Sequence, residues 1–444
     1  MHKQKNIVVI GGGAIGLCTA HYLQQSGHSV TVIEKGVYDK GTSLGNAGML
    51  VPSHVVPLAA PGVISQGMRW LFRRDSPFRI KPRLDPALMS WLWQFRSFCT
   101  EKHVARSMPL LRDLSLASVE AFASLATLFD FHFEQRGLLM VHRTDKGEKE
   151  NLKYGKKGQA AGLDVTFLTA DELKQKAPNL KSSARGAVYF PQDAHLSPNL
   201  FIAGITKALA DNGVVLRPDT AVTGFETTDT KNNRTIRAVN TNKGRIEADE
   251  VILAAGAWTP ALARMLRIKA PIQPAKGYSI TVDAPENAPT IPVILTEEKV
   301  TITPMGNKLR FGGTLELAGF DASVDLIRAR AIRNAIPDYL PSVSPDQIDQ
   351  KMIWSGFRPC TPDGLPIIGR PGTMQNLVIA SGHAMIGITL APITGQLVTS
   401  IINNEKPAID TEALHPDRFS RLGSLKQRAG TAGLPPQTEP LHAA

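Results

Sequence analysis

Near its N-terminus the chain reads Ile7-Val8-Val9-Ile10-Gly11-Gly12-Gly13-Ala14-Ile15-Gly16, an apolar strand that runs directly into a glycine turn spaced G-x-G-x-x-G. In such a turn Gly11 allows a sharp bend, Gly13 lets the backbone approach a pyrophosphate, and Gly16 lets the next helix pack closely on the strand. We expect that helix to span residues 14–26, with the phosphates at its positive N-terminus. The segment therefore predicts a dinucleotide site.

A second apolar strand, residues 29–33, ends at Glu34. A carboxylate about 20 residues past the glycines can accept hydrogen bonds from both ribose hydroxyls of an adenosine. An acid at this place disfavours a 2′-phosphate, so NADP is not expected. The motif leaves open whether the ligand is NAD or FAD.

Length and composition describe an ordinary globular protein with 444 residues, 43% of them hydrophobic, which is enough for a large core in two or three domains. The three cysteines, Cys18, Cys99 and Cys360, lie far apart and form no C-x-x-C pair, which favours a reducing compartment. We expect no metal, because H-E-x-x-H and clustered His/Cys patterns are absent from the sequence. The first strand starts too early for a signal peptide, so we expect a cytoplasmic protein.

The formal charge of +11 is not accompanied by a zinc knuckle, a basic helix or an aromatic-basic module, so we expect no nucleic-acid partner. The basic residues are concentrated between Arg69 and Arg83, where six of them face one acid and alternate with Trp70, Phe72 and Phe78. Such a stretch can rest on an anionic membrane surface at the inner face of the membrane. The alternative is a solvated loop whose aromatic rings pack on the protein.

The apolar run 377–402 contains His383, Pro392, Gln396 and three glycines, which a lipid-exposed helix would rarely carry. We interpret it as a strand at 377–380, a glycine loop at 381–387 and a buried helix that continues towards Ile402.

The dinucleotide-binding signals fall into three pieces, and we expect residues 1–84, 195–268 and 352–415 to form one discontinuous cofactor domain. Alternating apolar patterns, as in residues 278–282 and 300–303, predict a substrate domain with an antiparallel sheet, formed by residues 85–194 and 269–351. Residues 416–444 lose periodicity and are expected to form a loosely held tail. The predicted class is α/β with an α+β substrate part.

From about residue 6 to about residue 419 the chain resembles the FAD-dependent D-amino-acid oxidase superfamily, and within it the bacterial D-amino-acid dehydrogenases. Besides the glycine turn and Glu34, the shared motifs are Thr42-Ser43-Leu44-Gly45-Asn46-Ala47-Gly48-Met49, Ala59-Ala60-Pro61-Gly62, Lys276-Gly277-Tyr278-Ser279, Gly356-Phe357-Arg358-Pro359, Thr361-Pro362-Asp363-Gly364 and Gly382-His383. The resemblance implies non-covalent FAD in a Rossmann-type domain that a substrate domain interrupts. It also implies oxidation of an amine to an imine, with electrons passed to a quinone or another acceptor.

The same resemblance assigns the substrate carboxylate to Arg358, whose guanidinium fork suits a planar bidentate partner. Tyr278 is a second candidate for the carboxylate, and Asp363 is expected to order the loop beyond Arg358. Relatives usually carry a tyrosine at His54, near the flavin face, and often an aromatic residue at Ile388. A cyclic substrate such as D-proline or D-hydroxyproline therefore stays open, and we assign no general base.

Two other functions share these motifs: a glycine- or sarcosine-type oxidase that uses oxygen, and an FAD electron-relay subunit without amine turnover. In each case the cofactor is expected to contact the glycine turn, the end of the second strand, loop 42–49, the small residues after strand 251–254 and the C-terminal glycine loop. The expected cofactor residues are Gly11, Gly13, Ala14, Ile15, Gly16, Glu34, Lys35, Thr42, Ser43, Asn46, Ala47, Gly48, Met49, Val222, Ala255, Gly256, His383, Met385, Gly387, Ile388 and Thr389.

Overall fold

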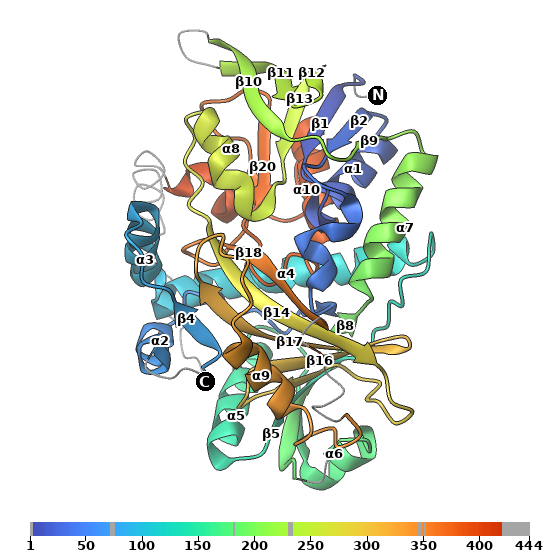
Figure 1. The fold of residues 1–444 in the computed structure, drawn as a ribbon, viewed down its shortest axis with the longest axis vertical. Helices are drawn as coiled ribbons and strands as arrows, with labels where there is room; N and C mark the ends of the chain where they lie inside the picture. The colour runs from blue at the N-terminus through green and yellow to red at the C-terminus, as the bar shows by residue number, and fades with distance from the viewer. Residues whose placement is uncertain are drawn as a thin grey trace, which may run out of the picture.

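The computed structural model describes residues 3–71, 76–180, 183–229, 234–343, 349 and 352–419 (Figure 1). Its described strands form two large sheets and two small ones. The first large sheet, in the upper half of Figure 1, has six strands in the order β19-β20-β13-β1-β2-β9, and all its pairings are parallel except β19 with β20. These strands are β1 (Asn6–Ile10), β2 (Ser29–Ile33), β9 (Val215–Arg217), β13 (Glu250–Leu253), β19 (Ile367–Gly369) and β20 (Leu377–Ser381).

Both faces of this parallel sheet are covered, as its nearly continuous apolar strands require. Ile7 and Val9 of β1 face one core, and Val8 and Ile10 face the other. The first core is closed by α1 (Ala14–Gln25), α4 (Glu101–Leu125), α7 (Pro198–Asp211) and α10 (Ala391–Asn403). The second is closed by β10 (Val222–Asp229), β11 (Arg234–Thr241), β12 (Gly244–Glu247) and α8 (Thr259–Met265).

The second large sheet, in the lower half of Figure 1, follows the order β18-β14-β17-β16-β15-β5-β7-β6, with β4 paired to β17. Its pairings are antiparallel except β15 with β5 and β17 with β4, so the sheet is mixed where a purely antiparallel one was expected. The strands are β4 (Phe78–Ile80), β5 (Leu138–His142), β6 (Thr166–Thr169), β7 (Gly186–Phe190), β14 (Gln273–Asp283), β15 (Val293–Leu295), β16 (Val300–Met305), β17 (Lys308–Leu317) and β18 (Ile353–Cys360).

Helices border this second sheet. Ile332 and Ala335 of α9 (Leu326–Ala335) and Leu173 of α6 (Ala170–Lys176) pack in one core with Tyr278, and Tyr154 of α5 (Asp145–Ala160) packs with another core. The remaining helices are α2 (Val63–Leu71) and α3 (Pro86–Phe98), and a two-stranded sheet joins β3 (Met49–Leu50) to β8 (Ala194–His195).

The structure differs from the expected division into domains at four places. β18 and β4, expected in the cofactor domain, pair with β14 and β17 of the second sheet. α4, expected in the substrate domain, packs against α10 and puts Leu111 and Phe122 in the core of the first sheet. The start of the expected tail also differs, because residues 416–419 form a short 3₁₀ helix in which Pro416 is buried and Arg418 pairs with Asp363. Residues 420–444 lie outside the described part of the chain.

The basic stretch 69–83 is tied to the protein by its second half. Arg79 pairs with Asp325 at 2.8 Å, and Lys81 pairs with Asp321 at 2.8 Å. Arg83 pairs with Asp85 at 2.9 Å and donates to the carbonyl of Leu317. Residues 72–75 lie outside the described residues. These pairings favour the packed-loop interpretation of residues 76–83, and no helix in the described ranges is long and apolar enough to cross a membrane.

Candidate active site

A cavity of about 990 Å³ is lined by residues of both large sheets. Its wall runs from the glycine turn and the N-terminus of α1, through the short helix η2 (Thr42–Gly45), to strands β14 and β18 and the loop 383–388. All the expected cofactor residues line it except Gly16, Gly48 and Thr389. Segments from three distant parts of the chain therefore meet at one cavity.

The glycine turn has the geometry that its spacing predicts. Gly11 has φ +117°, and a Cβ there would lie 2.4 Å from the carbonyl oxygen of Ala254, the residue after β13. A Cβ on Gly16 would lie 1.9 Å from the carbonyl oxygen of Gly11, so Gly16 serves helix packing and not the ligand. These contacts admit only glycine and leave the backbone of the turn open to a phosphate.

Two side chains complete this end of the cavity. The Glu34 carboxylate accepts hydrogen bonds from the backbone N–H of Gly12 at 2.8 Å and of Gly36 at 3.2 Å. The Ser43 hydroxyl accepts from the backbone N–H of Ala14 at 3.1 Å, which places it at the positive end of α1. Both residues lie where a dinucleotide's ribose and phosphates are expected.

Arg310 of β17 holds the loop after η2, although nothing in the sequence marks it. It is buried, and its Nη1 donates to the carbonyl oxygens of Leu44 at 2.6 Å and Asn46 at 2.7 Å. Burial lowers its pKa to about 10, and it remains a cation at neutral pH. By binding carbonyls from one side, Arg310 fixes the backbone of loop 42–49 beside the cavity.

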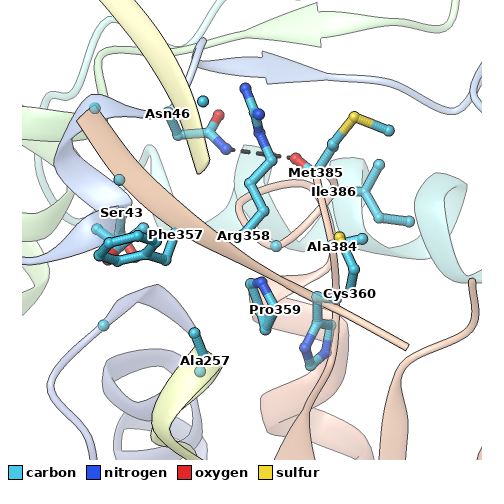
Figure 2. Close-up of a pocket in the computed structure, with 18 of the residues that line it drawn as sticks. Ser43, Asn46, Ala257, Phe357, Arg358, Pro359, Cys360, Ala384, Met385 and Ile386 are labelled. Carbon is cyan, nitrogen blue, oxygen red and sulfur yellow. Dashed lines mark hydrogen bonds between the residues drawn. The ribbon is translucent and has the colours of Figure 1, made fainter. Parts of the chain in front are cut away.

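Arg358 projects from β18 into the cavity, towards Asn46 (Figure 2). Its Nη1 donates to the carbonyl oxygen of Thr314 at 2.6 Å. Burial lowers its pKa from the usual value, and it has no carboxylate partner among the described residues. A guanidinium that stays charged in such a place favours an anionic ligand.

An irregularity in the pairing of β14 with β17 turns a backbone carbonyl towards Arg358. The register of β14 on β17 shifts between Lys276 and Tyr278, and in this bulge Thr314 adopts φ +66°. A β-branched residue in the left-handed region is strained by about 1–3 kcal/mol, and such strain gathers at functional sites. Here it turns the Thr314 carbonyl towards Arg358.

Strand alternation places Gly277, not Tyr278, on the side of Arg358. Gly277 is paired with Gly356 on β18, two residues before Arg358, so these positions share a face of the sheet. The hydroxyl of Tyr278 donates to Glu316 at 3.3 Å and accepts from the backbone N–H of Asp325 at 3.1 Å. This engagement of the hydroxyl on the α9 side does not support the prediction that Tyr278 binds a carboxylate.

Hydrogen bonds to α10 and to loop 42–49 hold the C-terminal glycine loop. His383 is buried, its Nε2 lies 3.0 Å from the Thr394 hydroxyl, and burial lowers its pKa to about 3, so it is a neutral structural residue on the cavity wall. The carbonyl of Met385 accepts from the Asn46 side chain at 3.5 Å, the dashed line in Figure 2.

Gly48 and Thr389 lie away from the cavity for identifiable reasons. Thr389 donates to the Met49 carbonyl at 3.2 Å and accepts from the Val51 N–H at 3.4 Å, which ties two loops together. A Cβ on Gly48 would lie 2.3 Å from the Leu196 carbonyl oxygen, so Gly48 packs against the chain before α7. The expectation that these two residues contact the cofactor is not supported by their positions.

Asp363 orders the loop after Arg358, as the sequence predicts. Its carboxylate accepts from Arg418 at 2.7 Å and from the backbone N–H of Leu365 at 3.1 Å, in a site where both charged side chains are buried. The backbone carbonyl of Asp363 lies 2.7 Å from His103 Nε2.

Comparison with known proteins agrees with this site. The family described as "FAD dependent oxidoreductase" matches residues 6–401, most of the chain. The chain belongs to this family. It is an FAD-dependent oxidoreductase, and its glycine turn, Glu34 and Ser43 have the arrangement expected of a dinucleotide site.

Relatives in sequence cover nearly the full length. The chain is 33% identical to a D-amino acid dehydrogenase of Methylobacterium radiotolerans, over 94% of this chain and 100% of that protein. It is 30% identical to a D-amino acid dehydrogenase of Vibrio atlanticus, over 93% of this chain and 99% of that protein.

Solved structures show the same fold. Glycine oxidase from Geobacillus kaustophilus superimposes with a TM-score of 0.74 at 25% identity, covering 94% of this chain and 100% of the other. L-proline dehydrogenase from P. horikoshii superimposes with a TM-score of 0.71 at 23% identity. The superposition covers 95% of this chain and 99% of the other.

Proposed function

We propose that the enzyme oxidises a D-amino acid, or a cyclic D-imino acid such as D-proline, to the corresponding imine, which water then hydrolyses. The observation that carries this proposal is Arg358, a guanidinium in the cavity without an acidic partner among the described residues. The names of the relatives at 30–33% identity support the D-configured substrate.

The chain's own groups orient and hold the substrate. Arg358 binds its carboxylate in a two-pronged contact, and the carbonyl of Thr314 holds the guanidinium in place. The chemistry that FAD would supply here, when bound, is that of a hydride acceptor for the substrate Cα–H. Fixing the carboxylate directs the Cα–H bond, so much of the rate enhancement comes from orientation.

The test is an anaerobic titration of the purified yellow protein with D-amino acids, their L-enantiomers, D-proline, glycine and N-methyl amines, with flavin bleaching as the signal. Bleaching by D- but not L-amino acids supports the proposal. Bleaching by amines that lack a carboxylate, at equal rates, contradicts it.

A glycine-type oxidase is the second candidate, since the glycine oxidase structure is similar at 25% identity. Peroxide formation in air at the rate of flavin reduction would favour this candidate, whereas slow reaction with oxygen and fast reaction with a quinone would favour a dehydrogenase. An electron-relay subunit predicts no bleaching by any amine.

We further propose that the electron acceptor is a quinone reached from an anionic membrane surface through α2 and α3. Both helices line the cavity, through Ile64, Met68 and Phe95 among others. They also expose apolar side chains: Met68 is 58% exposed, Met89 62% and Trp93 73%. Met89 and Trp93 stand four residues apart, on one face of α3, where they can enter a lipid interface.

A further inference from the structure

A chain of hydrogen bonds leads from the cavity to a buried carboxyl group. His54 lines the cavity, and its Nδ1 lies 3.2 Å from the hydroxyl oxygen of Ser53. The Ser53 hydroxyl donates to the Asp193 carboxylate at 2.5 Å, and the Ser53 backbone N–H donates to the same carboxylate at 2.9 Å. Ser53 and Asp193 are fully buried.

The single hydroxyl hydrogen of Ser53 determines the state of the histidine. When that hydrogen points to Asp193, the Ser53 oxygen accepts from Nδ1–H of His54. The other ring nitrogen, Nε2, then carries a lone pair. It has no hydrogen-bond partner in the described part of the chain, so it is available to a molecule in the cavity.

The substrate amine must lose a proton in the cavity before it can be oxidised. An α-amino acid arrives as an ammonium ion, and hydride can leave Cα only when the nitrogen lone pair is free to form the imine. Imidazolium is disfavoured in this cavity, since burial lowers the pKa of His54 to about 4. His54 alone is therefore a weak acceptor for the substrate proton.

We propose, on the basis of the function proposed above, that His54, Ser53 and Asp193 form a proton relay that removes one proton from the substrate ammonium. Nε2 of His54 takes the proton from nitrogen, Nδ1–H passes its proton to the Ser53 oxygen, and the Ser53 hydroxyl proton moves to Asp193. The products are a neutral amine, a neutral histidine of the opposite tautomer and a protonated Asp193. Charge and protons balance, and no imidazolium persists.

The environment of Asp193 suits a group that accepts a proton reversibly. Burial raises its pKa to about 8, although the two Ser53 hydrogen bonds lower it. Tyr154 contacts the relay, and His195 lies two residues from Asp193 along the chain. The Tyr154 ring meets His54 edge-on at 6.2 Å, and its hydroxyl donates to the Ser53 carbonyl at 3.1 Å. His195 of β8 is held neutral by burial, which lowers its pKa to about 4.

His54 would act here as a catalytic residue, and Ser53 and Asp193 as positioning residues that act through it. The test uses Asp193→Asn and Ser53→Ala, each with FAD bound, in anaerobic rapid mixing with the D-amino acid that reduces the wild type best. Tyr154→Phe is the matched control, because it keeps the ring against His54 and lies off the relay.

For the wild type and the control we expect the flavin-reduction rate constant to rise with an apparent pKa near 8 and then level off. In both relay variants the rate at pH 7 should fall by about 10²-fold, the usual contribution of a positioned acid or base. Their profile should continue to rise towards the pKa of the free substrate amine and approach the wild-type rate there. A purely structural loss would lower the rate equally at every pH.

A second readout needs no turnover. In protein labelled with ¹⁵N-histidine, the His54 signals, identified by their loss in His54→Asn, should show the Nδ1–H tautomer above pH 8 and shift in Ser53→Ala. Relay variants with wild-type pH profiles, or a tautomer that Ser53→Ala leaves unchanged, would overturn the relay. A wild type that no D-amino acid reduces would instead overturn the proposed function, and the relay's substrate with it.

Discussion

The guanidinium of Arg358 lies against Gly277, so closely that a Cβ built on Gly277 would come within 2.0 Å of Nη1. The two residues stand on neighbouring strands and on the same face of the sheet, and glycine leaves the volume that the arginine occupies. We predict that Gly277→Ala pushes the guanidinium aside and lowers kcat/KM for a D-amino acid by about 10²-fold, since a misplacement of about 1 Å costs that much. Gly224→Ala is the control, because a Cβ at Gly224 meets no atom within 4 Å.

Arg358→Ala should keep FAD and the fold but lose amino-acid turnover. Removal of a charge-assisted bidentate contact should cost about 3–5 kcal/mol, or two to four decades in kcat/KM. Arg358→Lys should restore part of the loss, because an ammonium supplies charge without the fork. Near-normal kcat/KM in the alanine variant would show that Arg358 is structural and that the substrate needs no carboxylate partner there.

Gly13→Val should yield a protein without yellow colour. A Cβ at Gly13 would lie 3.2 Å from the Ser43 hydroxyl, and the valine methyl groups would fill the space at the N-terminus of α1 where we expect the pyrophosphate. Flavin content is measured from absorbance after purification, with Gly224→Val as control. Full FAD occupancy in the Gly13 variant would refute the assignment of this turn.

Arg418→Ala should destabilise the protein strongly, because it leaves the Asp363 carboxylate buried and unpaired. The two side chains are 5% and 3% exposed, and breaking a buried pair costs about 3–5 kcal/mol. Lys207→Ala breaks a pair whose side chains are 76% and 58% exposed, and should cost less than about 1 kcal/mol. Denaturant unfolding of both apoproteins measures the difference, and equal midpoints would contradict the prediction.

The α2–α3 surface should bind anionic vesicles more strongly than neutral ones, with binding that weakens as salt increases. Trp93→Ser combined with Met89→Ser should reduce this binding in a flotation assay. Leu128→Ser removes an apolar side chain of similar exposure, 57%, from the turn after α4, and should leave binding unchanged. Equal binding to both vesicle types would refute membrane docking.

Local sequence determined the elements of the cofactor domain. The glycine turn, α1 and β2 appear where the spacing predicts, because the dihedral freedom of glycine and the apolar periodicity of strands act within a few residues. The interpretation of run 377–402 was also confirmed as a strand, a loop and the helix α10. The motif around Arg358 was found by resemblance, and its position in the cavity agrees.

Tertiary structure alone decided which side chains act together. The face of β14 depends on its register with β18, and this puts Gly277 beside Arg358 and turns Tyr278 away. The hydrogen bonds of Arg310 to loop 42–49 join residues more than 260 positions apart in the sequence. The hydrogen bond between Ser53 and Asp193 joins residues 140 positions apart. Hydrogen bonds of such sequence separation leave no periodic pattern in the chain, since they depend on how strands pair and how loops pack.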